Sequence, residues 1–245
     1  MRMMKKVLGT VTVLALSVSL LAGCGSTAAS PVSSAASTAA ESTTSSIASE
    51  TTSAAADENE AAAAQLLNDL TGSYQELWPV ILADEYKQTW LDDCTALVGE
   101  DNAEAAFEKL SSMVTGDVYG EDAVKAYANG GGAYFCGFTN SLATLTFDGE
   151  TSTISGTDKD GNVLFSHTYH YIGMEPVRGL YEFESDDADS GEFTYFFLAP
   201  DTSAETYHIE FRYGSDAEAL SQYDAGEYAY WLASGISTDC DQTMI

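Results

Sequence analysis

The segment formed by residues 206–213 carries the side chains best suited to binding a metal ion. Polar and apolar residues alternate along it, which predicts a β-strand. Its polar face would carry Thr206, His208, Glu210 and Arg212. His208 and Glu210 would then lie about 7 Å apart along the strand, close enough to offer one ion an imidazole nitrogen and a carboxylate oxygen. A solvent-exposed strand face of mixed charge has the same pattern, so both interpretations stay open.

The other two histidines of the chain lie in a second predicted strand, residues 163–172. His167 and His170 are three positions apart. Because side chains alternate between the two faces of a strand, an offset of three places them on opposite faces. They cannot both serve one site.

The sequence lacks the short motifs of several common enzyme classes. It has no G-x-S-x-G, H-E-x-x-H, C-x-x-C or G-x-x-x-x-G-K motif, so no hydrolase or nucleotide enzyme is indicated. The residues 158–161, Asp-Lys-Asp-Gly, are similar to the start of a calcium loop but lack its closing Glu, and they predict a hairpin turn. A glycan-cleaving carboxylate pair is unsupported, because some pair always looks suitable among 38 acidic residues. We expect a protein that is not an enzyme.

Charge and composition exclude one class of partner. The chain has 38 Asp and Glu against 9 Lys and Arg, for a net charge of -29. Nucleic-acid affinity depends on Lys and Arg that neutralise phosphates, so nucleic acid is excluded as a partner. A hydrophobic content of 45% is enough for one sizeable core. Cys94, Cys136 and Cys240 show no metal-ligand spacing, and either one disulfide or free thiols would fit.

The N-terminus reads as a targeting sequence. A basic start, Arg2, Lys5 and Lys6, precedes an apolar stretch that ends in Leu-Ala-Gly-Cys at residues 21–24. This ending resembles the lipobox of bacterial lipoproteins. It predicts a signal peptide over residues 1–23, lipidation of Cys24, and a domain held at the extracytoplasmic face of a bacterial membrane. Residues 24–57 are almost wholly Ser, Thr and Ala and predict a disordered tether.

Residues 58–245 should form one folded domain. Helices are expected at 57–70, 89–98, 102–112 and 121–129, and a last one from Ser215, where Ser215 and Glu218 match a capping box. Short strands are expected at 134–138, 142–147, 151–155, 163–172, 177–184, 192–198 and 206–213. Asp-Gly pairs at 148–149 and 160–161 separate consecutive strands. This succession predicts an up-and-down antiparallel barrel or a sandwich.

Four blocks of the chain resemble, in the same order, those of the ZinT (YodA) family. They are residues 74–79 (YQELWP), 169–173 (YHYIG), 180–184 (LYEFE) and 207–211 (YHIEF), the last followed by Gly214 and a helix through Leu220. The resemblance runs from about residue 66 to 236. It implies a lipocalin-like (calycin) barrel, mainly β with helical additions, in an extracytoplasmic protein. It also implies binding of zinc or cadmium in support of zinc recruitment to an ABC importer.

The departures from the family pattern fall on the metal ligands. The family binds metal through a His on one strand and a His-x-His on the next. Here His-x-His becomes His208-x-Glu210, and Ala199 stands at the place of the isolated His. A carboxylate can replace an imidazole as a zinc ligand. The third ligand would have to be His167, His170 or a nearby Asp or Glu, and we predict the set His208, Glu210 and His167. The family's two disulfide cysteines align with His167 and Ser185, so that bridge is absent.

Two functions from different classes follow. The first is a membrane-anchored zinc-binding protein that passes the metal to a transporter. The second is a barrel that kept the fold, lost the metal, and binds a small organic ligand or a protein partner. Convergence of His208, Glu210 and a third donor favours the first function, whereas a dry aromatic cavity without such a cluster favours the second.

Overall fold

The computed structural model describes residues 58–240. The predicted signal peptide (1–23), the predicted tether (24–57) and the predicted lipidation site at Cys24 lie outside the described residues. Among the residues that are described, no helix is both long enough and apolar enough to cross a membrane.

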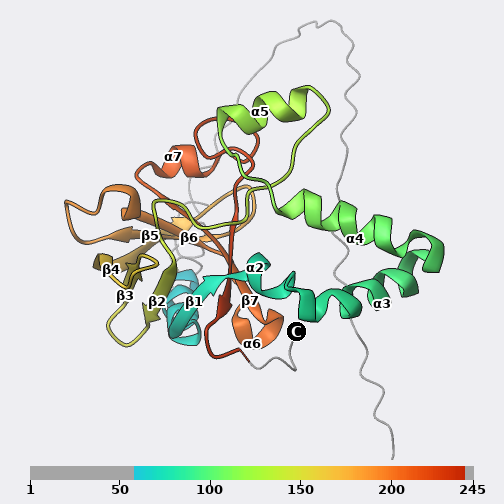
Figure 1. Cartoon of the computed structure of the whole chain (residues 1–245). Coiled ribbons are helices and arrows are strands. Elements are labelled where there is room, and N and C mark those ends of the chain that lie inside the picture. Colours follow the sequence, from blue (N-terminus) through green and yellow to red (C-terminus); the bar gives the residue numbers. More distant parts are fainter. Residues whose placement is uncertain (1–57, 241–245) are drawn as a thin grey trace, which may run out of the picture. The chain divides into compact units, whose positions relative to one another are not determined.

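Eight antiparallel strands form a closed barrel in which each strand pairs with the next along the chain and β1 closes on β8 (Figure 1). The strands are β1 (Gly72–Glu76), β2 (Thr144–Asp148), β3 (Thr153–Thr157), β4 (Val163–Met174), β5 (Tyr181–Ser185), β6 (Tyr195–Leu198), β7 (His208–Gly214) and β8 (Ala233–Ser237). The predicted antiparallel barrel with helical additions is confirmed. Closure leaves no unpaired strand edge in the sheet.

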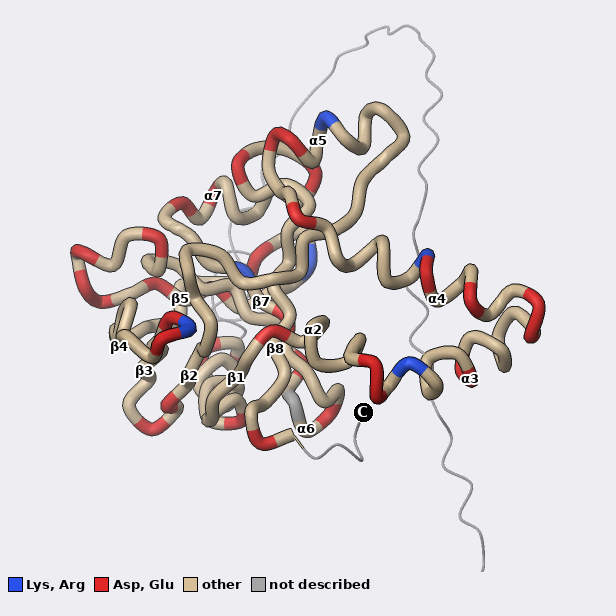
Figure 2. The backbone as a smooth tube through the Cα atoms, in the orientation of Figure 1, with Lys and Arg blue, Asp and Glu red and all other residues tan. Residues whose placement is uncertain are grey.

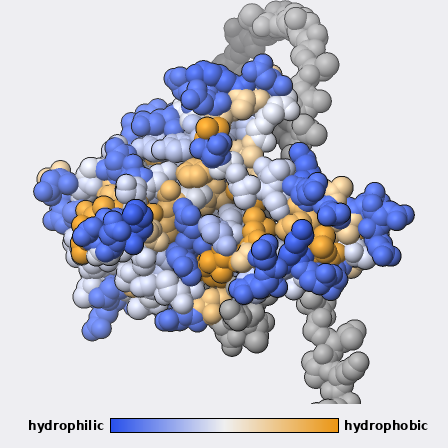
Figure 3. Space-filling view, viewed as in Figure 1, coloured by the Kyte–Doolittle hydropathy of each residue, from blue (hydrophilic) through white to orange (hydrophobic). Residues whose placement is uncertain are grey.

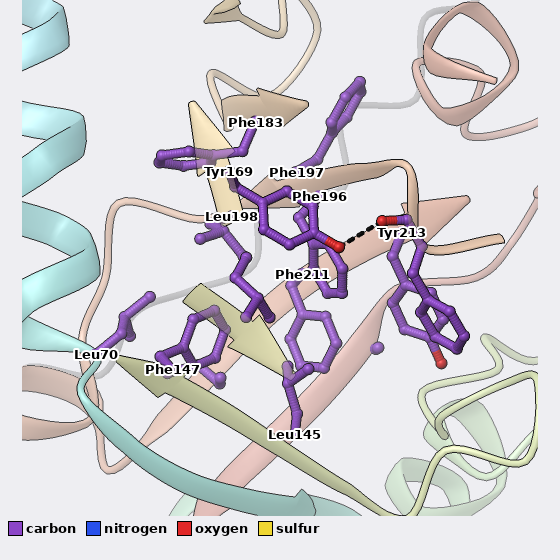
Figure 4. Close-up of a cluster of buried hydrophobic side chains, with 14 of the residues drawn as sticks. Leu70, Leu145, Phe147, Tyr169, Phe183, Phe196, Phe197, Leu198, Phe211 and Tyr213 are labelled. Atoms are coloured by element: carbon purple, nitrogen blue, oxygen red, sulfur yellow. Dashed lines mark hydrogen bonds between the residues drawn. The ribbon is translucent and has the colours of Figure 1, made fainter. Parts of the chain in front are cut away.

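Large apolar side chains fill the interior of the barrel. Figure 4 shows a cluster of buried side chains, and its labelled members are Leu70, Leu145, Phe147, Tyr169, Phe183, Phe196, Phe197, Leu198, Phe211 and Tyr213. Phe197 pairs with Arg212 and lies with it on the outer face of the sheet. All ten are at most 3% exposed. The hydroxyl of Tyr169 donates a hydrogen bond of 2.5 Å to the carbonyl of Phe193, so even the polar end of this buried ring has a partner. The interior is a packed core rather than an open ligand cavity.

A helix over residues 58–69 packs on the core at one end of the barrel. Its buried residues Ala63, Leu66 and Leu67, with Leu70 just after it, recur at helical spacing and form one apolar face. Gly149 in the β2–β3 turn allows the close approach. A Cβ atom at that position would lie 2.4 Å from the Cα of Asn68, which is too near for any other residue.

The helical additions lie mainly between β1 and β2. They are α2 (Leu77–Ile81), the 3-10 turn η1 (Asp84–Tyr86), α3 (Lys87–Val98), α4 (Glu100–Val114) and α5 (Glu121–Ala128). Leu77 and Ile81 of α2 pack with Ile236 of β8 in a cluster separate from the barrel core. Since Ala233 of β8 belongs to the barrel core, this cluster lies on the outer face of the sheet. The helices α3 and α4 pack on each other beside the barrel (Figure 1).

Some sequence predictions of single elements are wrong. Residues 134–138 form no strand. Phe135 makes two isolated bridges, to Thr115 and to Trp231. The strands β1 and β8 were not expected. The chain forms a short helix, α6 (Ser203–Thr206), where a strand was predicted to begin, and β7 starts at His208. The 3-10 turn η2 (Gly191–Phe193) replaces the start of the strand expected at 192–198.

The last predicted helix is present but shorter and capped differently. It is α7 (Ala217–Leu220), and its N-cap is Asp216, whose carboxylate accepts a hydrogen bond of 3.0 Å from the backbone N–H of Ala219. Asp216 therefore has the role that the capping-box pattern gave to Ser215. Both are short side chains with an acceptor oxygen, so sequence alone places the cap only to within one residue.

Candidate metal site on the outer face of β7

His208 and Glu210 share the outer face of β7. The alternate residues Ile209, Phe211 and Tyr213 point into the barrel core. The two candidate ligands therefore point away from the core, and both are half-buried. The prediction that they lie on one strand face is confirmed.

The ring of His208 is held in one tautomer. Its Nδ1 lies 2.8 Å from the carbonyl oxygen of Thr206. A carbonyl can only accept a hydrogen bond, so Nδ1 must carry the proton. In the neutral ring Nε2 then keeps its lone pair, as a metal ligand requires, and a backbone carbonyl is a usual partner for the other nitrogen of a metal-binding histidine.

A strained residue creates this arrangement. Tyr207 has a φ of 60°, a left-handed conformation that a bulky aromatic residue seldom adopts. It stands between the end of α6 at Thr206 and the first residue of β7. Thr206 also donates from its hydroxyl to the carbonyl of His208, at 2.7 Å. The turn places the Thr206 carbonyl against the imidazole ring.

The carboxylate of Glu210 is available for a ligand. Its backbone pairs with Ser234 of β8. Within the described residues, its side chain makes neither a hydrogen bond nor an ion pair. A half-buried carboxylate has lost part of its hydration, and without such a partner no hydrogen bond or ion pair offsets that loss. A bound cation would therefore stabilise it.

His167 is placed elsewhere. It lies on β4, where its backbone pairs with Ile154 of β3, and its ring is 6.0 Å from Phe165 and 6.5 Å from Tyr169. Its Nδ1 is 2.8 Å from a carboxylate oxygen of Asp187. In the part of the chain that the structure describes, no three His, Cys, Asp or Glu residues are grouped so that they could hold a metal. The structure therefore does not bring His167 to His208 and Glu210, and the predicted three-residue set is not assembled.

His170 is also paired with an aspartate. It lies on β4 with an exposed side chain, and its Nδ1 is 2.7 Å from a carboxylate oxygen of Asp186. His167 and His170 thus lie on opposite faces of β4, and each contacts one of two consecutive aspartates in the same loop. The prediction that they cannot serve one site agrees with this placement.

Sequence reasoning missed Cys136, which lies one strand away from Glu210, with Ser234 of β8 between them. The thiol is buried, and burial together with the negative charge of Glu210 raises its pKa to about 11, against the opposing effect of polar contacts with Trp78 and Ser234. Cys136 also lines a pocket of about 380 Å³ with residues of α2 and of the end of α4. This electrostatic effect joins residues 74 positions apart in the chain, and no spacing rule could have indicated it. Within the described residues, Cys94, Cys136 and Cys240 form no disulfide.

The electrostatic setting favours cations. Acidic residues are spread over the loops and helices of the described domain, and Lys and Arg are few (Figure 2). Such an excess of negative charge raises the local concentration of cations. It does not select one metal, so selectivity must come from the ligands.

No family model matches the sequence, and no curated protein matches it. Solved structures similar to the chain include two from Streptococcus pneumoniae. One is the Zn(II)-bound ZinT-like domain of AdcA from Streptococcus pneumoniae, with 16% identity and a TM-score of 0.45 over 73% of this chain and 88% of that domain. The chain is similar to ZinT-like domains. The other is Zn(II)-bound AdcA from the same organism, with 16% identity and a TM-score of 0.44 over 71% of this chain. This chain spans a third of that longer protein, 33%.

Proposed function

We propose that the domain binds a divalent transition metal, zinc or cadmium, on the outer face of β7, and that it does so at the extracytoplasmic face of a bacterial membrane. Cys24 carries the lipid anchor, and the bound zinc is passed to an ABC importer. No bond is made or broken in this scheme. The importer as partner rests on the resemblance of the sequence to the ZinT family.

The state of His208 is the observation that carries the proposal. Its Nδ1 proton is committed to the Thr206 carbonyl, which leaves Nε2 as an acceptor on the same face as the unpaired carboxylate of Glu210. The other two histidines have their Nδ1 atoms at aspartate carboxylates, which would also leave Nε2 as an acceptor, but they lie on β4 and not on the strand that carries Glu210. An imidazole and a carboxylate are both common zinc ligands.

The alternative of an organic ligand inside the barrel has less support. Side chains that are almost fully buried occupy the interior, as Figure 4 shows. A protein partner has no specific support either, because the exposed apolar side chains are scattered. In Figure 3 they are interspersed with hydrophilic residues on the visible face, and the most exposed, Leu97, Val163 and Val177, belong to different elements.

Calorimetric titration with zinc tests the metal site. We expect the chain carrying Cys24→Ser, treated with a chelator beforehand, to bind zinc at one saturable site with micromolar or tighter affinity. Calcium should not compete, because calcium prefers six to eight oxygen ligands. Weak heats that do not saturate, or equal binding of calcium, would mean that only the acidic surface attracts the ion.

Mass spectrometry of the exported chain tests the anchor. We expect the mature protein to begin at Cys24 and to carry the added mass of a lipid. The Cys24→Ser variant should lack that mass and keep its first 23 residues, whereas Cys240→Ser should be processed normally. A mature chain that begins elsewhere and carries no lipid would disprove the anchor and leave the metal site untouched.

A further inference from the structure

A pocket of about 380 Å³ lies between α2, the end of α4 and residues 135–137, and we call it the α2–α4 pocket. Neither His208 nor Glu210 lines it, so the proposed metal binding leaves it without a role. Small-molecule sites have volumes of about 300 to 1,000 Å³. The pocket is therefore large enough for a small organic ligand.

Close backbone contacts hold the walls of the pocket in place. The N–H of Gly116 donates a hydrogen bond of 3.0 Å to the carbonyl of Tyr134, and a Cβ atom at Gly116 would lie 2.9 Å from the same oxygen. The carbonyl of Gly137 accepts a hydrogen bond of 2.9 Å from the indole of Trp231, which belongs to the barrel core. Such walls are formed before a ligand arrives, so binding requires little ordering of the protein.

Glu76 contributes a carboxylate to the wall of the pocket. The residue is half-buried, and its Oε1 accepts a hydrogen bond of 2.6 Å from the backbone N–H of Phe138. Within the described residues, Glu76 makes no ion pair. A half-buried carboxylate without a counter-ion favours a ligand that carries a positive charge.

Trp78 contributes an unpaired hydrogen-bond donor. Its Nε1 atom is buried, and it makes no hydrogen bond within the part of the chain that the structure describes. Its polar contact with Cys136 is with a sulfur, which is a weak acceptor. A buried N–H without an acceptor costs free energy, and a ligand oxygen bound there would remove that cost.

The remaining walls are mainly apolar. They include Pro79 and Leu82 at α2, Val114 at the end of α4, and the ring of Phe135. Walls of this kind favour a ligand with an apolar body and few polar groups. A free carboxylate on the ligand would be repelled by Glu76 and by the net charge of -29, so the oxygen that reaches Trp78 must belong to an uncharged group.

We propose that the α2–α4 pocket binds a small organic amine that also carries an uncharged carbonyl. Its ammonium group pairs with the carboxylate of Glu76, its carbonyl oxygen accepts from Nε1 of Trp78, and its apolar body lies against Phe135 and the aliphatic walls. Amides of aromatic amino acids have this combination of groups. The inference does not depend on the proposed metal binding, since the two sites share no residue.

Nuclear magnetic resonance at the indole N–H of Trp78 tests this assignment. The probe is L-phenylalaninamide, added to the chain that carries Cys24→Ser. The chain has three tryptophans, and Trp78→Phe identifies the signal by its loss. We expect a saturable downfield shift of this N–H, because it gains an acceptor. The matched ligand 3-phenylpropanamide lacks only the amine and should bind at least tenfold more weakly.

Glu76→Gln tests the charge on the protein side. Glutamine keeps an acceptor oxygen for the N–H of Phe138, and we expect it to weaken phenylalaninamide binding at least tenfold. Glu150→Gln is the matched control, an exposed carboxylate in the β2–β3 turn, and it should change the affinity less than twofold.

Three results would overturn the inference: no saturable shift at Trp78, equal affinity for the two ligands, or equal losses in Glu76→Gln and Glu150→Gln. The comparison of the two ligands uses the protein without substitution at the pocket, so it decides the matter even if Glu76→Gln does not fold. None of these results changes the expectation for zinc.

Discussion

Arg212→Met should lower the free energy of unfolding by about 3 to 5 kcal/mol. Arg212 is fully buried on β7, and its guanidinium donates hydrogen bonds to the carbonyls of Leu220 and Tyr228. A third carbonyl, that of Gln222, is 3.4 Å away. Methionine keeps much of the side-chain volume but leaves these carbonyls in the interior without donors, and each unsatisfied group costs about 1 to 3 kcal/mol.

The chain supplies a matched control for this variant. Arg178 and Arg212 both lie over the ring of Tyr223, at 4.5 Å and 4.4 Å from its centre. Arg178 is exposed, so Arg178→Met should cost less than about 1 kcal/mol. Urea unfolding measures both differences from the shift of the midpoint at constant slope. Equal losses in the two variants would show that the stacking on Tyr223, and not the buried carbonyls, makes Arg212 important.

Arg212 also shows where the sequence stops being informative. Alternation along residues 206–213 correctly places Arg212 on the same face as His208 and Glu210. It does not indicate that the segment after β7 covers this end of the strand and buries the arginine. Burial lowers the pKa of Arg212 to about 10, so the guanidinium still carries its charge at neutral pH. One face of a single strand thus holds a candidate metal site and a buried structural cation.

The elements that the sequence missed are those with weak local signals. β8 is built from Ala-Ser-Gly-Ile-Ser, in which four of the five residues are small and carry little strand propensity, and only Ile236 packs against α2. The strand β1 is five residues long and is followed directly by α2. Residues 134–138 have the aromatic content of a strand but make only isolated bridges. Long segments of alternating residues, such as β4 and β7, were predicted to within two residues at each end, because burial of one face dictates their pattern.

The candidate site was predictable only in part, for the same reason. His208 and Glu210 are two positions apart in sequence, so strand geometry alone places them together. The left-handed conformation of Tyr207 positions the Thr206 carbonyl and depends on α6. It could not be predicted from the sequence, because glycine is the residue that usually indicates such a conformation and none stands there. The approach of Cys136 depends on how the chain between β1 and β2 returns to β8. Contacts of this kind are set by tertiary structure and leave no periodic pattern in the sequence.

His208→Ala should weaken zinc binding at least tenfold and leave the fold intact. The side chain is half-buried at the start of β7, outside the barrel core, so its loss removes one ligand and no core packing. The affinity should fall because Nε2 is the donor whose lone pair is already fixed by the Thr206 carbonyl. Calorimetric titration measures the affinity, and circular dichroism checks the fold.

His170→Ala is the matched control for this variant. His170 is a strand histidine that also points outward and has a partner at Nδ1, Asp186, but it lies on β4 and not on the strand that carries Glu210. Its loss should change zinc affinity less than twofold. An unchanged affinity in His208→Ala would remove this residue from the site. Equal losses of zinc affinity in both variants would mean that zinc binds diffusely to histidines and carboxylates over the acidic surface. A defined site would lose affinity only when the histidine that belongs to it is replaced.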